Sequence, residues 1–173
     1  MDILLRAKHW QIFSGLISIG ALEYVLKNES ELSGDISYIS LMIIQIGWIL
    51  MLGTILKNRL RNPNKISYLN FIITGIFLLV VTSLYKIVLT NSEIAKIADN
   101  VPFFIGFSIY SLVSISIVNG FVAKTIRSIE KNNVVNISDY LGDTLLLIFW
   151  PIGIWYIQPR LNKIFDLNSF ENF

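Results

Sequence analysis

The sequence contains no cysteine, a single histidine, His9, and few charged residues, which make up 15% of the chain. Without cysteine there can be no disulfide, thiol nucleophile or thiolate metal ligand. One imidazole cannot hold a transition metal by itself, and the chain has no zinc-protease, serine-hydrolase or phosphate-loop signature. We therefore expect no enzyme activity, no catalytic residues, no bound metal and no cofactor.

Apolar residues are abundant instead. They make up 54% of the 173 residues, and the mean hydropathy is +0.62. This composition is typical of membrane proteins rather than of soluble domains of this size. The start, "MDILLRAKHW", places two cations before an apolar run with no small-residue cleavage site, which indicates a retained signal anchor. The small excess of Lys and Arg lies in short hydrophilic gaps, so we expect no binding of double-stranded nucleic acid.

Four apolar stretches are long enough to cross a bilayer as helices, at about 10–26, 38–56, 66–90 and 102–123. A hydrocarbon core about 30 Å thick needs roughly 20 such residues, because a helix satisfies its own backbone groups where water is absent. The predicted fold is an all-α integral membrane bundle that forms a single domain over residues 1–173.

Lysine and arginine gather on one side of the predicted spans. Arg6 and Lys8 precede the first span, and the hydrophilic stretches on the same side form a basic collar of Lys57, Arg59, Arg61, Lys65, Lys124, Arg127 and Lys131. The other two gaps contain only Lys27 and Lys96, among acidic residues. Because positive loops stay in the cytoplasm, we predict a cytoplasmic N-terminus and a cytoplasmic basic collar.

The C-terminal stretch "FWPIGIWYIQPRLNKIF", residues 149–165, is apolar but interrupted. Its apolar run is short for a crossing, and Pro151 removes a helical hydrogen bond while Gly153 loosens the next turn. We predict a broken helix over about 141–164, with its break at "PIG" and a short second helix that dips into the inner leaflet or lies along it. A fifth crossing is the alternative. The residues predicted to lie at the interface are Trp150, Pro151, Trp155, Tyr156 and Arg160.

The region between the fourth span and this broken helix carries further predictions. The fourth span should continue past the membrane as an amphipathic helix, because apolar residues keep one face beyond Phe121. Ser138 is the predicted N-cap of the final segment. Two carboxylates close to the inner surface, Asp139 and Asp143, are expected to pair with cations of the N-terminus, namely Arg6, Lys8 or His9.

Ionisable side chains inside the spans need partners, since each costs at least about 2.5 kcal/mol on insertion scales. Glu23 and Lys86 fall at similar depth near the outer ends of the first and third spans. We predict an ion pair between them. The pair either fixes two neighbouring helices or takes part in gating or ion passage.

The fourth span is rich in small polar residues, and four of them share one arc of the helix: Ser108, Ser111, Ser116 and Asn119. On the second span, Gln45 shares a face with Trp48. Such side chains either form hydrogen bonds between packed helices or line a pore, and the sequence leaves both alternatives open.

Three segments resemble a family of small multipass membrane proteins of Bacteroidetes-type bacteria: "RAKHWQIF" at 6–13, "FVAKTIRSIE" at 121–130 and "PIGIWYIQPRLNKI" at 151–164. The resemblance covers both ends of the chain, and the middle only as hydrophobic spans. It implies a location in the bacterial inner membrane, and it brings no established activity.

Two functional hypotheses follow. The first is a homo-oligomeric channel or pore, gated by an anionic or nucleotide signal at the basic collar, as in a phage-defence effector. Several copies are required, because a bundle of this size is too narrow to enclose a water path. The second is a non-catalytic membrane adaptor or assembly factor that docks a cytoplasmic protein partner. The expected partners are therefore the lipid bilayer, further copies of the chain, and a cytoplasmic nucleotide or protein.

Overall fold

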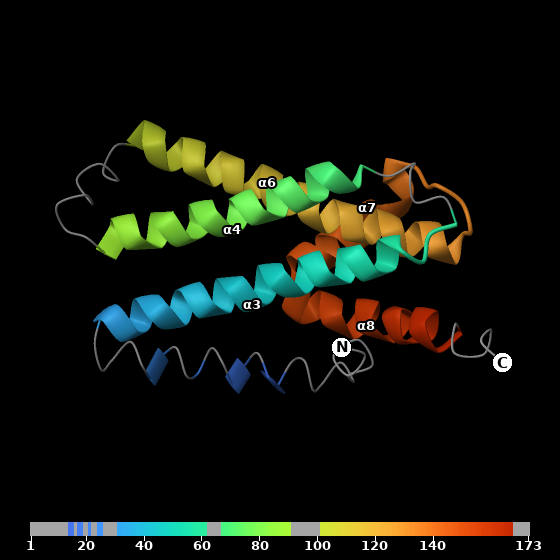
Figure 1. Ribbon diagram of the computed structural model, residues 1–173, viewed down its shortest axis with the longest axis horizontal. Helices are drawn as coiled ribbons and strands as arrows, with labels where there is room; N and C mark the ends of the chain where they lie inside the picture. The colour runs from blue at the N-terminus through green and yellow to red at the C-terminus, as the bar shows by residue number, and fades with distance from the viewer. Residues whose placement is uncertain are drawn as a thin grey trace. The chain divides into compact units, whose positions relative to one another are not determined.

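The computed structural model describes residues 31–61, 67–90 and 101–167, together with positions 14, 15, 17, 18, 21, 24 and 25. It contains the helices α3 (Glu31–Lys57), α4 (Tyr68–Thr90), α6 (Val101–Glu130), α7 (Ile137–Ile148) and α8 (Trp150–Leu167), as Figure 1 shows. No β-strand occurs among the described residues. The predicted all-α class is confirmed for this part of the chain.

Three segments are long and apolar enough to cross a membrane: Ile36–Lys57, Tyr68–Tyr85 and Pro102–Glu130. They agree with the second, third and fourth predicted spans. The first predicted span, 10–26, lies largely outside the described residues, although the described positions within it are helical. The structure therefore supports a membrane protein with three candidate spans, and the fourth span stays a prediction.

Most of the surface of these three segments is not covered by the protein itself. Only 17% to 28% of each segment's most apolar window is buried. The exposed side chains of α4 recur every three or four residues, at Leu69, Ile73, Ile76, Val80 and Leu84. Such a stripe of large aliphatic side chains would be unfavourable in water but is what hydrocarbon accepts. We infer that these stripes face lipid.

The chain divides into two compact units. The first, here called the span unit, consists of 18–50 with 69–118. Its helices α4 and α6 meet through aromatic rings: Tyr85 stacks on Phe107 with centroids 3.8 Å apart, and Phe77 meets Tyr110 edge-on at 5.5 Å. These ring contacts are expected to fix the pairing of the two helices, since such aromatic pairs contribute about 0.5–1.5 kcal/mol each beyond their buried area.

The second, here called the end unit, consists of 1–17, 51–68 and 119–173. Within it, the last turns of α3 and α6 pack with α7 and α8 around a core of Leu52, Leu56, Val122, Ile126, Leu147, Ile157 and Leu161. Tyr68, at the start of α4, joins two of these helices. Its hydroxyl lies 3.0 Å from Thr54 Oγ1 on α3, and its ring lies 6.2 Å from the ring of Phe121 on α6.

Helix α6 is continuous from Val101 to Glu130, which confirms its predicted extension past residue 123. It ends in a C-terminal cap at Asn132, whose φ of 51° lies in the left-handed region. The Asn132 and Asn133 N–H groups donate to the Ile129 and Ser128 carbonyls, at 3.2 and 3.1 Å. This pattern is a Schellman motif, and asparagine tolerates its left-handed position better than most residues. The cap turns the chain back towards α7.

Helix α7 begins at Ile137, and its N-cap is Asn136. The predicted N-cap at Ser138 was therefore wrong. The reason is the carboxylate of Asp139, which accepts a hydrogen bond from the Asn136 N–H at 3.2 Å. An acidic side chain three residues into a helix reaches back in this way when the N-cap lies at Asn136.

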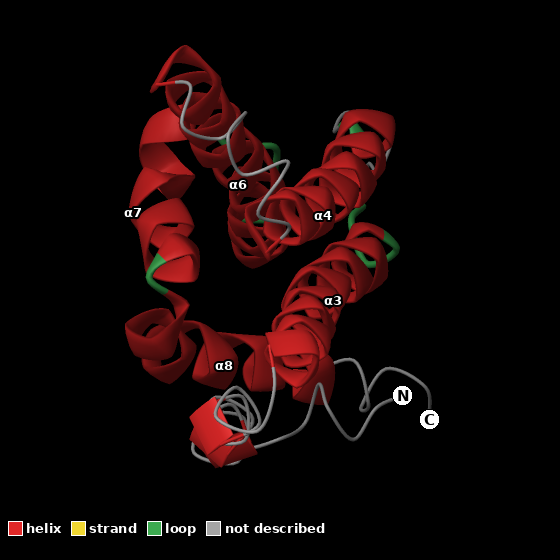
Figure 2. Ribbon diagram, turned by 90° about the vertical axis from the view of Figure 1, so that its left-hand side faces the viewer, coloured by secondary structure: helices red, strands yellow, loops and turns green. Residues whose placement is uncertain are grey.

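The break between α7 and α8 lies at Phe149, slightly before the predicted "PIG". Pro151 is instead in the first turn of α8, where its fixed φ and missing N–H are tolerated. Figure 2 shows the resulting sharp corner at its lower left. Helix α8 then continues for 18 residues, through Pro159, and is longer than the short second helix that the sequence suggested.

Gly153 makes this corner sterically feasible. A Cβ atom at Gly153 would clash with the backbone carbonyl of Leu146 on α7, whereas a Cβ at Gly142 would meet no atom within 4 Å. The carbonyl is fixed by its helix and cannot rotate away. The close approach of α8 to α7 therefore depends on glycine at position 153.

We expect Gly153→Ala to lower the free energy of unfolding by about 1–3 kcal/mol, because the added methyl group forces the two helices apart. Gly142→Ala is the matched control, and it should be neutral or stabilise by up to about 1 kcal/mol, since alanine is the better helix former. Chemical denaturation of the detergent-solubilised protein measures both. Equal stabilities for the two variants would contradict the proposed role of Gly153.

Candidate functional site

Two cations and two carboxylates from three helices meet in the end unit. Arg127 and Glu130 stand on the last turns of α6, Asp143 on α7 and Arg160 on α8. Arg127 and Glu130 are three residues apart and so share one helical face. We call these four side chains the charge network.

Arg160 is at the centre of the charge network. Its Nε and Nη2 donate to the two carboxylate oxygens of Glu130, at 2.6 and 2.7 Å. Its Nη1 and Nη2 donate to those of Asp143, at 2.8 and 2.9 Å. Both edges of one guanidinium are thus occupied by a carboxylate in the bidentate geometry that makes arginine a strong partner. In this way α8 is tied to α6 and α7 together.

Asp143 is the most buried member, with 4% of its surface exposed. A second cation approaches it from the other side, since Arg127 Nε lies 2.7 Å from Asp143 Oδ2. A buried carboxylate without a cation would be strongly unfavourable, whereas here two positive and two negative charges balance. The network is therefore expected to fix the arrangement of the three helices more than to add net stability.

The charges also determine the protonation behaviour at the edge of the unit. Burial by itself would lower the pKa of Arg160, but its hydrogen bonds to Glu130 and Asp143 outweigh this and raise the pKa above its ordinary value. Arg160 therefore stays charged at any physiological pH. Close by, hydrogen bonds from Lys131 and from the Asn136 N–H lower the pKa of Asp139.

Sequence reasoning missed this network. Asp143 was expected to pair with the N-terminal cations, which lie outside the described residues, and Arg160 was assigned to an interfacial tail. The structure instead pairs Asp143 with Arg127 and Arg160. The two arginines and Glu130 stand in the segments 121–130 and 151–164, which lie far apart in the sequence. Their pairing could not be read from sequence spacing.

The basic collar divides into paired and unpaired cations. Lys131 pairs with Asp139, and Arg127 belongs to the charge network. The Lys57 ammonium lies 3.9 Å from the centre of the Tyr68 ring, and the Arg59 guanidinium lies 4.8 Å from that of Phe165. Within the described part of the chain, no carboxylate lies at ion-pair distance from Arg61 and Lys124 of the collar, or from Lys163 on α8. Lys65 lies outside the described residues.

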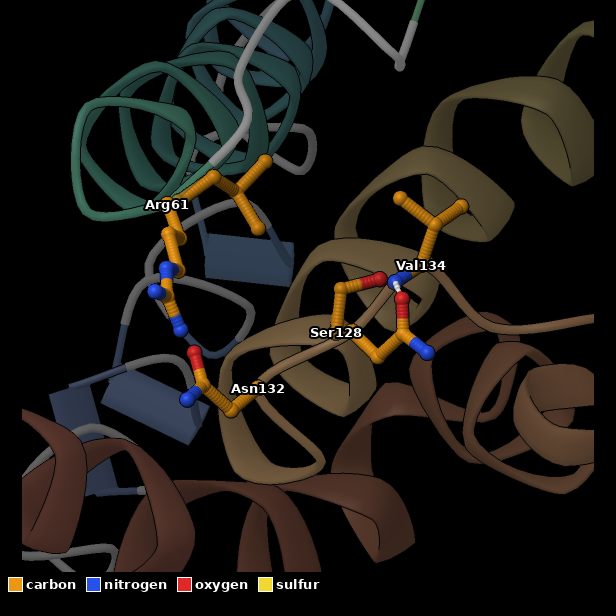
Figure 3. Close-up of a pocket in the computed structure, with 6 residues that line it drawn as sticks. Arg61, Ser128, Asn132 and Val134 are labelled. Atoms are coloured by element: carbon orange, nitrogen blue, oxygen red, sulfur yellow. Dashed lines mark hydrogen bonds between the residues drawn. The ribbon is translucent and has the colours of Figure 1, made fainter.

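A small surface hollow lies beside the cap of α6, lined by Leu60, Arg61, Ser128, Asn132, Asn133 and Val134. Figure 3 shows Arg61 and Asn132 pointing towards one another across it. The Ser128 hydroxyl is buried and has no hydrogen-bond partner among the described residues. The cavity volume is about 20 Å³, whereas sites for drug-sized ligands measure about 300–1,000 Å³, so this hollow is too small to enclose a nucleotide.

The predicted arc on α6 is not uniform in its surroundings. Ser108 and Ser116 donate to the carbonyls of Phe104 and Leu112 on their own helix, at 2.9 and 2.8 Å. Ser116 is exposed, whereas Asn119 is buried. The four side chains therefore do not share one exposed face, and whether any of them lines a pore stays a prediction.

The other predicted polar positions are described in part. Gln45 is half-buried on α3. Glu23 and the side chain of Lys86 lie outside the described residues, so their ion pair stays a prediction. Of the residues predicted to lie at the interface, Trp155 and Tyr156 are exposed. The side chains of Trp150 and Pro151 are not among those that the structure describes.

Comparison with known proteins adds no assignment. No protein-family model, curated protein or solved structure matches the chain. Among the described residues, no group of three or more acidic or histidine side chains is arranged to hold a metal ion. The charge network is thus the main polar site of the described end unit. Its role is structural, because it holds α6, α7 and α8 together; we call this role the lock.

We expect Arg160→Ala to lower the free energy of unfolding by about 1.5–3 kcal/mol, because the change removes the bidentate contacts of Asp143 and Glu130 and leaves them only Arg127 as a partner. Lysine should not rescue it, since a single ammonium cannot reproduce the two bidentate contacts. Lys163→Ala, an exposed cation on the same helix, is the control and should change stability by less than about 0.5 kcal/mol. Denaturant titration of Arg160→Ala, Arg160→Lys and Lys163→Ala measures these free energies. Similar losses of stability for Arg160→Ala and Lys163→Ala would refute the structural role of the charge network.

Proposed function

We propose that this protein is a non-catalytic membrane adaptor of the bacterial inner membrane, which presents its end unit to an acidic cytoplasmic protein. The proposal includes the family resemblance and the cytoplasmic orientation inferred from the basic collar. Its support comes from the way in which charge is distributed over the end unit.

The observation that carries the proposal is a set of uncompensated cations on a fixed platform. The charge network uses Arg127 and Arg160 and leaves no net charge of its own. Arg61, Lys124 and Lys163 then remain without a carboxylate among the described residues. Lys124 and Lys163 stand on α6 and α8, and Arg61 lies shortly after the end of α3. Cations placed in this way next to a membrane attract anionic groups.

A protein partner is favoured over a nucleotide by the available space. The hollow beside Arg61 is too small to enclose a nucleotide, whereas a protein can contact several separate cations at once. The outward stripes of the spans are aliphatic, which suits an anchor surrounded by lipid. Both features support an adaptor that acts at its cytoplasmic end.

Photo-crosslinking in living cells tests the adaptor. A photoreactive residue at Lys124 or Lys163 should yield a discrete protein adduct, and Arg61→Glu should weaken that adduct several-fold. The same residue at Leu112, on the aliphatic face of α6, should yield no protein adduct and serves as the control. Absence of adducts at both cationic positions, or adducts insensitive to Arg61→Glu, would contradict the proposal.

A homo-oligomeric channel is the second candidate, and one observation favours it. In the span unit, three hydroxyl oxygens are buried without a hydrogen-bond partner among the described residues: Ser83 Oγ, Tyr110 Oη and Ser111 Oγ. An unsatisfied hydroxyl costs about 1–3 kcal/mol by mutational data, and hydroxyls that turn towards a water path between several copies would be relieved of this cost. In this candidate the basic collar receives the anionic or nucleotide signal of a phage-defence effector.

The absence of native cysteine makes the channel directly testable. If several copies enclose a water path along α6, Ser111→Cys should react with a water-soluble thiol reagent in liposomes, and the reaction should block ion flux. Leu112→Cys, one residue along and facing outward, should stay unreactive. Liposomes that show no flux, together with a protected Ser111→Cys, would reject the channel and leave the adaptor.

A further inference from the structure

Helix α7 runs antiparallel to the last part of α6, as two successive ion pairs show. Asp139 pairs with Lys131 and Asp143 pairs with Arg127, and a Cβ added at Gly120 would sit 3.9 Å from both Tyr140 and Thr144. Each step forward along α7 is a step back along α6. The chain therefore returns from the end of α6 towards the middle of that helix.

The depth of α7 follows from this register, because α6 contains the candidate span Pro102–Glu130. A hydrocarbon core of about 30 Å that begins at Pro102 extends for roughly 20 helical residues and thus reaches the region of Gly120. In the two ion pairs the residue number falls on α6 as fast as it rises on α7, so Phe149, at the end of α7, lies near the level of Phe121. The end of α7 is thereby placed at the edge of the apolar layer, on the side of the basic collar.

Helix α8 then leads back to the level from which α7 started. Arg160 binds Glu130, the last residue of α6, at 2.6 Å. Further along α8, the Phe165 ring lies 4.8 Å from the Arg59 guanidinium, in the loop that follows α3. Both contacts place the C-terminal half of α8 on the side of the basic collar. A fifth crossing would instead carry Arg160 and Phe165 away from that side.

The two helices carry a set of large apolar side chains that stay largely exposed. It consists of large side chains that are between 47% and 64% exposed, at Leu141, Leu145, Phe149, Ile152, Trp155 and Tyr156. Along α7 they recur every four residues up to its C-cap Phe149, and on α8 they stand three and four residues after Ile152. The opposite face of α7 buries Asp143, Thr144 and Leu147. We call the six exposed residues the lipid face.

The corner itself is suited to hydrocarbon, where free backbone groups are costly. The Phe149 N–H donates to Leu145, and the Phe149 carbonyl accepts from both Ile152 and Gly153, at 3.0 Å each. Pro151 has no N–H to satisfy. Few donors of the first turn of α8 are therefore left without a partner.

From these observations we propose that α7 and α8 form a re-entrant hairpin, which enters and leaves the bilayer on the side of the basic collar. Its lipid face contacts the acyl chains of that leaflet. Helix α7, with 12 residues, is about 18 Å long and cannot cross the hydrocarbon core. The hairpin does not depend on whether the protein is an adaptor or a channel.

The cysteine-free chain allows depth to be measured with single nitroxide labels in liposomes. Labels at Leu145→Cys and Phe149→Cys should collide with oxygen several-fold more than with a water-soluble nickel complex. Lys163→Cys, exposed on the polar part of α8, is the control and should show the opposite preference. Nickel accessibility at both apolar positions would overturn the proposal, because the lipid face would then lie in water.

Two further readings separate the hairpin from its alternatives. Ser138→Cys and Lys163→Cys should both react with a membrane-impermeant maleimide from the same side, whereas labelling from opposite sides would establish a fifth crossing and overturn the proposal. Strong spin–spin coupling at Phe149→Cys, lost on dilution with unlabelled protein, would mean that a second copy covers the face and would also overturn it. Retained elution volume and helical circular dichroism show that each variant is folded.

Discussion

The arrangement of the end unit depends on the guanidinium of Arg160, which binds carboxylates of two other helices at once. Glu130 at the end of α6 and Asp143 on α7 occupy its two edges, and Arg127 supplies the second positive charge. Charges of this kind are tolerated in a buried place only when they balance. Because the balance requires three helices in one register, the network determines where α8 lies after the corner.

The corner between α7 and α8 and the charge network together determine the course of α8. Gly153 lets the first turn of α8 approach the carbonyl of Leu146, and this approach turns the chain back. Arg160 then reaches Glu130. Backbone donors near the turn are satisfied by Phe149 or removed by Pro151. The charge network suits the end of α8 that lies at the membrane surface. The corner, where nearly all backbone N–H groups have hydrogen-bond partners, suits the end that lies in hydrocarbon.

The same charges bear on function. Because the charge network is neutral, it removes Arg127 and Arg160 from the cations available to a partner and leaves Arg61, Lys124 and Lys163. The aliphatic stripes of α4 and α6 face outward, while several hydroxyls of the span unit are buried. An adaptor uses the cations, and a channel would use the hydroxyls. Of the three cations, Arg61 and Lys163 are exposed and Lys124 is half-buried, whereas a water path requires several copies.

Hydropathy alone determined the all-α class and the three described spans, because a helix in hydrocarbon must be long, apolar and self-satisfied, and each of these properties is local in sequence. The continuation of α6 past residue 123 and a break close to Pro151 were readable for the same reason. Only the tertiary structure decided which charges meet. Asp143 could have paired with any cation near the surface, and its partners Arg127 and Arg160 lie 16 and 17 residues away along the chain. Ion pairing between helices depends on how the chain turns between them. That turn depends on the close approach of Gly153 to the Leu146 carbonyl, and the hydrophobic periodicity of the sequence does not indicate this contact.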